Sequence, residues 1–182
     1  MRKKKNILAI VGSASANSTN HRLVAKIENL TKNEFCVTIV GDLKILPHFD
    51  PEQSLRNPPA PVVEFKTWIE RADGVIICTP EYIFSIPGGL KNALEWCVSS
   101  TVFAEKPTGI VTASANGLKG HEELQLIMKT LMAKFNSSST LLIQGVKGKF
   151  DELGNIIDPE TSRHLEGFVK GFIGLVNNDS KE

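Results

Sequence analysis

The sequence lacks several features that mark specialised classes of protein. It has no excess of charge, because 21 Lys and Arg residues against 20 Asp and Glu residues give a net charge of +1 at pH 7. Without a basic footprint, we expect no nucleic-acid partner. No apolar run approaches the roughly 18 residues of a membrane helix, so we expect no membrane partner either.

Cysteine is scarce as well. Cys36, Cys78 and Cys97 are far apart in the sequence and form no C-x-x-C pair. This spacing indicates buried free thiols in a reducing compartment, and it predicts neither a disulfide framework nor a metal site.

The first residues imitate a signal peptide, since the basic "MRKKK" precedes the apolar "ILAIVG" and the small residues "SASA". The apolar centre, however, is only about six residues long, shorter than the usual 7–15, and a glycine ends it. Cleavage would also remove a segment that is predicted to be a central strand. We therefore expect a cytoplasmic protein.

Length and composition favour one globular domain over residues 1–182, because 41% hydrophobic and 23% charged residues are ordinary values for a folded chain of this size. We expect residues 177–182, "NNDSKE", to be a disordered tail.

Apolar runs of strand length alternate with helical patterns along the chain. Most runs are near-continuous in Ile, Val and Leu, which is typical of parallel strands covered on both faces. Alternation of this kind predicts an α/β fold with one parallel sheet and helices on both faces. The predicted strands are 7–12, 36–41, 74–80, 108–114 and 139–145.

Apolar side chains at helical spacing predict the faces that the helices bury. The predicted inward-facing residues are Leu23, Ile27 and Leu30; Val62, Phe65, Ile69 and Ala72; Leu90, Ala93, Leu94 and Cys97; Leu124, Met128, Leu131 and Phe135; and Leu165, Phe168, Val169, Phe172 and Val176.

Two helix starts carry capping signals. Asp158 is a candidate cap with Pro159 at the first helical position, and Ser85 is a candidate cap with Pro87 in the first turn. By contrast, the proline-rich segment Leu46–Pro61 is expected to be a long irregular connection over one edge of the sheet.

The loop after the first strand, within "VGSASANSTNHRL", is small and rich in hydroxyl and amide groups. It leads into a helix whose unpaired N–H groups and positive dipole end suit a phosphate. It matches neither the Walker pattern nor G-x-G-x-x-G, so an ordinary capped turn remains an equal interpretation of the residues alone. The candidate binding residues here are Ser13, Ser15, Ser18, Thr19 and Asn20.

Two further loops are candidates for a ligand site, because ligands of such sheets bind at the carboxyl ends of the strands. The segment Thr79–Trp96 contains Pro80, Tyr82, Ile83 and Phe84, which suit a planar ring. The alternatives are a hydrophobic staple onto the next helix or a contact between subunits. The small residues of "TASANGLKG" would let the backbone of the third loop approach a ligand closely.

Three motifs together, "GSASANSTNHRL", "TPEYIFSIPGGLKNALEW" and "GKFDELGNIIDPET", resemble the NADPH-dependent FMN reductase family. This is the flavodoxin-like group that includes chromate, azo and quinone reductases. The resemblance covers about residues 6–176. It implies a three-layer sandwich with strand order 2-1-3-4-5 and FMN at the switch between the first and third strands.

The resemblance also implies roles for individual residues. Ser13, Ser18 and Asn20 would hold the FMN phosphate, with Ser15 and Thr19 in the same loop. The other implied residues are Pro80, Glu81, Tyr82 and Ile83 along the isoalloxazine edge, where the backbone of Glu81 matters more than its carboxylate, and Ser114, Ala115, Asn116 and Gly117 on the opposite side.

At two positions the chain departs from the family pattern. The family commonly has an arginine where this chain has Ser15, and it commonly has asparagine after P-E-Y where this chain has Ile83. The first departure removes a positive charge from the phosphate loop, and the second replaces a polar contact with an apolar wall.

The implied activity is that of an FMN-dependent oxidoreductase with NADPH or NADH as hydride donor and no catalytic side chain. The acceptor is a small molecule such as a quinone, an azo compound, chromate or free flavin. The alternatives are a flavodoxin-like electron carrier, which the near-neutral charge disfavours, and a non-catalytic flavin-binding protein. Family members form homodimers or homotetramers, and we expect Tyr82, Phe84 and Trp96 to be exposed for such a contact.

Overall fold

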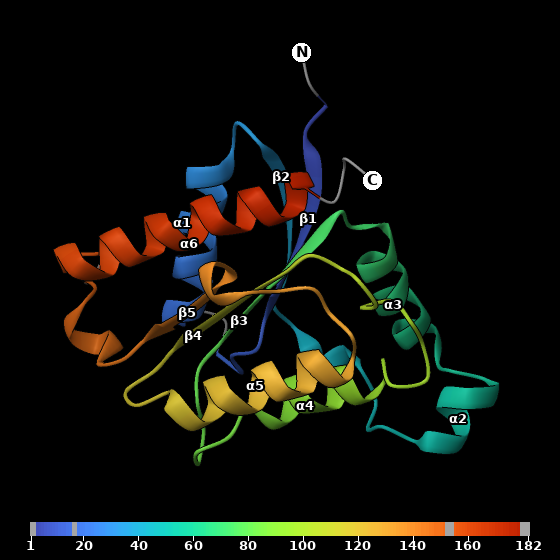
Figure 1. Cartoon of the computed structure of the whole chain (residues 1–182). Helices are drawn as coiled ribbons and strands as arrows, with labels where there is room; N and C mark the ends of the chain where they lie inside the picture. Colours follow the sequence, from blue (N-terminus) through green and yellow to red (C-terminus); the bar gives the residue numbers. More distant parts are fainter. Residues whose placement is uncertain (1–2, 16–17, 152–154, 179–182) are drawn as a thin grey trace.

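The sheet has five parallel strands in the order β2-β1-β3-β4-β5 (Figure 1). The computed structural model describes residues 3–15, 18–151 and 155–178. All five predicted strands and the predicted order are confirmed. The strands are β1 (Lys5–Val11), β2 (Phe35–Val40), β3 (Gly74–Thr79), β4 (Thr108–Ala113) and β5 (Thr140–Ile143).

Helices cover both faces of this sheet (Figure 1). In β1, Ile7, Ala9 and Val11 face a core shared with α1 and α6, whereas Leu8 and Ile10 face a second core shared with α3, α4 and α5. Burial on both faces explains why the strand sequences are near-continuous in apolar residues. The helices are α1 (Thr19–Thr31), α2 (Pro51–Arg56), α3 (Ala60–Arg71), α4 (Gly88–Glu95), α5 (Leu118–Thr130) and α6 (Pro159–Asn178), with short 3₁₀ turns η1 (Leu43–Ile45), η2 (Ser137–Ser139) and η3 (Val146–Gly148).

One of the two predicted caps is confirmed. Asp158 Oδ2 accepts a hydrogen bond from the Thr161 N–H at 2.8 Å, and Pro159 is the first residue of α6. The prediction for α4 was wrong in its cap: Pro87 is the N-cap, and the Ser85 hydroxyl instead donates to Glu123 at 2.6 Å.

Several other expectations need correction. Leu30 is 41% exposed because α1 buries Leu23, Val24, Ile27 and Thr31, which leaves Leu30 on the flank of that face. Phe135 lies beyond the end of α5 at Thr130. The connection 46–61 contains α2, which Asp50 caps by accepting from the N–H groups of Glu52 and Gln53.

The cysteines are free, but only two are buried as expected. Cys78 and Cys97 lie in the two cores, and burial raises the pKa of the Cys97 thiol to about 12. Cys36 is exposed because it lies on β2, the strand at the edge of the sheet.

The end of the chain is more helical than expected. Helix α6 continues to Asn178, so the first two residues of the predicted tail are helical, and residues 179–182 lie outside the described part of the chain. Among the described residues, no helix combines the length and the apolar character that crossing a membrane requires.

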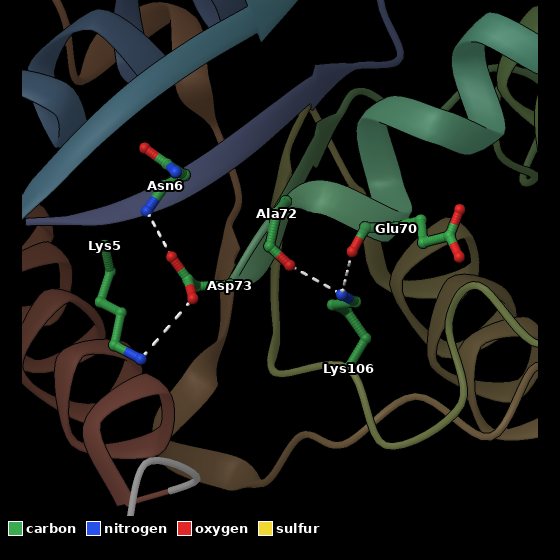
Figure 2. Close-up of polar contacts among 6 residues, drawn as sticks. All are labelled: Lys5, Asn6, Glu70, Ala72, Asp73 and Lys106. Atoms are coloured by element: carbon green, nitrogen blue, oxygen red, sulfur yellow. Dashed lines mark hydrogen bonds and ion pairs between the residues drawn. The ribbon is translucent and has the colours of Figure 1, made fainter.

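The amino ends of the strands are joined by polar contacts (Figure 2). Asp73 Oδ2 accepts from the Asn6 N–H at 2.7 Å, and its other oxygen lies 3.6 Å from Lys5 Nζ. The Lys106 ammonium donates to the carbonyl oxygens of Glu70 and Ala72 at the end of α3, at 3.1 and 2.7 Å. Asp73, which precedes β3, is thus joined to the start of β1, and Lys106, which precedes β4, is joined to the end of α3.

Candidate functional site at the carboxyl ends of the strands

The three loops singled out from the sequence converge because β1, β3 and β4 are neighbouring parallel strands. The Gly12 N–H donates to the Cys78 carbonyl at 2.9 Å. The Ser114 hydroxyl donates to the Glu81 carbonyl at 3.4 Å. The candidate residues of all three loops therefore lie together at the carboxyl ends of the strands, which we call the carboxyl edge of the sheet.

The loop after β1 approaches β3 closely. A Cβ at Gly12 would lie 2.6 Å from Thr79 Oγ1 and 2.8 Å from a Leu90 methyl carbon, so only glycine fits here. Ser13 is buried and its hydroxyl accepts from the Ser15 N–H at 3.3 Å, whereas Ser15 is exposed. Ala16 and Asn17 of this loop lie outside the described residues.

The first turn of α1 presents donors and no acid. Ser18 is the N-cap, and its hydroxyl oxygen accepts from the His21 N–H at 3.3 Å. Thr19, the first helical residue, is half-buried, and no acidic side chain occurs in this turn. The positive end of the helix dipole is thus left uncompensated by a carboxylate, which favours an anion.

His21 has a packing role. Its Nδ1 lies 3.0 Å from the Ser18 hydroxyl oxygen, and its imidazole fills the space beside Gly41, where a Cβ would collide with the ring. The side chain therefore joins the start of α1 to the segment after β2.

Asn20 is turned toward the sheet. Its Nδ2 donates to the Ala113 carbonyl at 3.3 Å, and its Oδ1 accepts from the Cys78 thiol at 3.3 Å. Burial raises the pKa of the Cys78 thiol, so the sulfur keeps the proton that it donates. Asn20 ties α1 to the ends of β3 and β4, and its contact with a phosphate stays a prediction.

The loop after β3 contains a two-residue hairpin turn. The Tyr82 N–H donates to the Ser85 carbonyl at 2.9 Å, and the Ser85 N–H donates back to the Tyr82 carbonyl at 3.1 Å. Between them, Ile83 and Phe84 have φ angles of 51° and 56°. Such turns favour Asn-Gly, and the left-handed conformation costs other residues about 1–2 kcal/mol each. A β-branched isoleucine here is a strained residue.

The tip of this turn is apolar and exposed. Ile83 is 96% exposed, Phe84 68% and Tyr82 45%. The Ile83 side chain therefore does not pack against α4 as a hydrophobic staple. Pro80, which precedes the turn, is buried. The expectation that Trp96 is exposed was wrong: its indole is fully buried, and its Nε1 donates to the Pro47 carbonyl at 2.8 Å.

Two carboxylates connect the turn to α5. Glu81 Oε1 accepts from the Gly117 N–H at 3.0 Å, and Oε2 accepts from the Gly120 N–H at 2.8 Å. Glu81 thus caps α5 from another loop, which the sequence did not indicate. Glu123 Oε2 accepts from the Ser85 hydroxyl at 2.6 Å and from the Ile86 N–H at 3.0 Å. Glu123 was missed, and no spacing signal connects it to a turn 38 residues away.

The loop after β4 offers small residues. Ala115 and Asn116 are exposed, and Asn116 Oδ1 accepts from Gln144 Nε2 at 3.2 Å. Gly117 has a φ of 84°, a conformation that glycine adopts without strain, and it is the N-cap of α5.

A pocket of about 480 Å³ adjoins the loop after β1 on the side of α4. Sequence reasoning did not anticipate it, because it combines the first loop with the segment after β2 and the start of α4. Its lining is Gly12, Ser13, Ala14, Gly41, Asp42, Leu43, Lys44, Leu46, Pro47, His48, Gly88, Gly89 and Asn92.

His121, near the start of α5, is a further titratable group at this edge. Its Nδ1 lies 2.8 Å from the Thr112 hydroxyl oxygen, and burial lowers the pKa of the imidazole, an effect that the charge of Glu122 opposes. Within residues 3–15, 18–151 and 155–178, no group of three or more His, Cys, Asp or Glu side chains is arranged to hold a metal ion.

Comparison with known proteins identifies relatives along nearly the whole chain. The model of a family described as NADPH-dependent FMN reductase matches residues 5–146. A quinone reductase from Escherichia coli (strain K12) is 30% identical over 94% of this chain and 95% of its own length. The NADH:(hydroxy)cinnamate reductase subunit CrdA of Vibrio ruber is 33% identical over 92% of this chain and 85% of its own.

The fold also matches a solved structure, that of FerB, a flavoenzyme NAD(P)H:(acceptor) oxidoreductase from Paracoccus denitrificans. The TM-score is 0.77, with 23% sequence identity over 96% of this chain and 98% of that one.

Proposed function

The chain belongs to the NADPH-dependent FMN reductase family and is an FMN-dependent NAD(P)H oxidoreductase, and we propose that its electron acceptor is a small quinone. The observation that supports this acceptor is the exposed apolar tip Tyr82–Phe84, which offers a planar, apolar molecule a surface beside the loops of the site. The relative from Escherichia coli is named a quinone reductase.

The residues at the carboxyl edge suit FMN. The described part of the first loop and the first turn of α1 contain hydroxyl and N–H donors and no carboxylate, which is the donor set that a phosphate monoester requires. Gly12 has no side chain and Ser114 and Ala115 have small ones, so the first and third loops place no bulky side chain at these positions.

We assign the phosphate to Ser13, Ser15, Ser18 and Thr19, with Asn20 fixing the helix from which the last two project. Pro80, Glu81, Tyr82 and Ile83 line one side of the ring, and Ser114 to Gly117 the other. Bound FMN supplies the hydride chemistry. The protein supplies orientation, backbone donors and an apolar wall at Ile83.

The first test of this function is spectroscopic. The purified protein is titrated with FMN, and the complex is then mixed with NADPH or NADH without oxygen. We expect the visible flavin absorption to shift on binding and to bleach with a nicotinamide donor. Binding without bleaching by either donor would contradict the oxidoreductase assignment.

The acceptor is tested by steady-state turnover of a benzoquinone, an azo dye, chromate and free FMN under the same conditions. We expect the quinone to have the highest kcat/KM. A higher value for another acceptor would contradict the quinone proposal and leave the FMN assignment intact.

The phosphate site is tested by Ser15→Arg, which restores the positive charge that the family commonly has in this loop. Because Ser15 is exposed, the new guanidinium has room, and we expect roughly fivefold tighter FMN binding, the effect of one exposed ion pair. Ser137→Arg adds the same charge before β5, at the amino ends of the strands, and serves as the control. Equal effects of the two substitutions would contradict the assigned loop.

Two broader properties complete the proposal. We expect a homodimer or homotetramer in which the exposed tip Tyr82–Phe84 contacts a second copy, and light scattering of the FMN-loaded protein tests this. We place the protein in the cytoplasm, because its three thiols are free. Cell fractionation tests that placement.

A further inference from the structure

The turn Tyr82–Ser85 cannot be held by packing at its tip, because Ile83 and Phe84 are largely exposed. Its two central residues nevertheless keep a left-handed backbone that isoleucine and phenylalanine disfavour. The conformation must therefore be fixed from the two ends of the turn.

Both ends are fixed by the same helix. Before the turn, the Glu81 carboxylate accepts from the N–H groups of Gly117 and Gly120 at the start of α5. After it, Ser85 and Ile86 donate to Glu123, one helical turn further along α5 than Gly120. Positions three apart lie on the same face of a helix, so the two anchors are neighbours.

The helix is itself a firm support. Leu124 and Met128 of α5 are completely buried in the core on this face of the sheet, and His121 is hydrogen-bonded to Thr112 of β4. Helix α5 thus fixes the position of the turn relative to the sheet.

We propose that Glu123 is a positioning residue for the flavin: its carboxylate, together with that of Glu81, holds the strained turn in the shape that receives the FMN ring. This inference rests on the proposed function, which places the ring against Pro80–Ile83. The backbone at position 83 is left-handed, a conformation that asparagine tolerates better than isoleucine does. With isoleucine there, this chain depends on the anchor at Glu123.

The test compares three substitutions on α5. Glu123→Ala removes both hydrogen bonds, and we expect FMN to bind about tenfold more weakly, the effect of losing hydrogen bonds to a charged acceptor. In Glu123→Gln the amide oxygen still accepts, so we expect a change below about threefold. Glu122→Ala is the matched control, because Glu122 is exposed and pairs with Lys119 on the surface.

A second variant separates positioning from loss of fold. Ile83→Asn relieves the strain at the turn, so Glu123→Ala is expected to weaken FMN binding much less in the Ile83→Asn background than in the wild type. Wild-type affinity in Glu123→Ala overturns the proposal. Failure of Ile83→Asn to rescue also overturns it, because the loss then reflects general destabilisation.

Hydrogen exchange of the peptide containing residues 82–86, measured without FMN, tests the anchor independently of the cofactor. We expect faster exchange in Glu123→Ala and unchanged exchange in Glu122→Ala. If the wild-type protein bound no FMN, the proposed function would fail. Unchanged exchange in Glu123→Ala would instead overturn the anchor itself, whether or not FMN binds.

Discussion

The strands begin at one side of the sheet, the amino edge, and end at the other, the carboxyl edge. These two edges use similar polar contacts for different purposes. At the amino edge, Asp73 joins the start of β1, and Lys106 covers the last carbonyl oxygens of α3 (Figure 2). At the carboxyl edge, Glu81 and Glu123 reach from a loop to a helix and from a helix to a loop. The first set fixes segments that the core already orders, whereas the second holds a turn whose own side chains face outward.

This difference shows what an exposed, strained turn requires. At a strand or helix end, side chains such as Asp73 and Lys106 supply partners for backbone groups that are otherwise unpaired. A left-handed turn with an apolar tip gains nothing from burial, so its shape depends on hydrogen bonds at its ends. Substitutions at the amino edge should therefore change stability alone, and substitutions at the carboxyl edge should also change ligand binding.

The largest effect is expected from Gly12→Ala at the carboxyl edge. The added Cβ would collide with Thr79 and Leu90, and overpacking of this kind costs about 2 kcal/mol of unfolding free energy. Since Thr79 immediately precedes the Pro80 loop, FMN should also bind more than about tenfold more weakly. Chemical denaturation and FMN titration measure the two effects.

Gly88→Ala is the matched control at the same edge, because a Cβ there meets nothing within 4 Å. We expect no loss of stability from it. An equal loss in both variants would show that the close approach at Gly12 is not the cause.

The next largest effect belongs to the amino edge. Lys106→Met keeps most of the stem but leaves the carbonyl oxygens of Glu70 and Ala72 without their donor. Because Lys106 is only half-buried, we expect a loss of about 1 kcal/mol of unfolding free energy. FMN affinity should stay unchanged, and a weakened affinity would contradict the separation of the two edges.

The sequence predicted the sheet because its strands are buried on both faces, so that Ile76 and Ile77 of β3 both had to be apolar. It predicted the loops of the site for the same reason, since parallel strands place their carboxyl ends together. It missed α2, although Asp50 and Pro51 carried the capping signal, because the surrounding prolines suggested an irregular chain.

Other features could not be predicted from local patterns. Trp96 looked like an exposed aromatic, yet the carbonyl of Pro47, distant in sequence, satisfies its N–H inside the core. The anchor at Glu123 depends likewise on a contact between distant residues. Periodicity reports which face of an element is buried, and it does not report which polar group meets which.

A smaller effect, of opposite sign, is expected at the turn. Ile83→Asn places a residue that tolerates a positive φ at the strained position and should raise the unfolding free energy by about 1 kcal/mol. It also removes the apolar wall, so the KM for a quinone should rise about threefold.

Glu105→Asn is the counterpart at the amino edge, because Glu105 has a φ of 56° and precedes β4. It should stabilise the protein similarly and leave the quinone KM unchanged. A change in KM from Glu105→Asn would mean that stability, and not the wall at Ile83, controls quinone binding.

The smallest expected difference is the pH dependence that His121 adds at the carboxyl edge. Burial lowers the pKa of its imidazole below the ordinary 6.5, so protons bind the unfolded state more readily than the folded one. The stability that the buried, uncharged imidazole contributes is therefore complete above about pH 6.5 and is lost as the pH falls toward the folded-state pKa.

His121→Gln cannot titrate but retains a hydrogen-bonding partner for Thr112. Denaturation at pH 7.5 and at pH 5.5, performed on both proteins, should show a larger loss of stability on acidification in the wild type. Equal losses would place the imidazole in contact with solvent, and the amino end of α5 would then be a looser support for the turn than its packing implies.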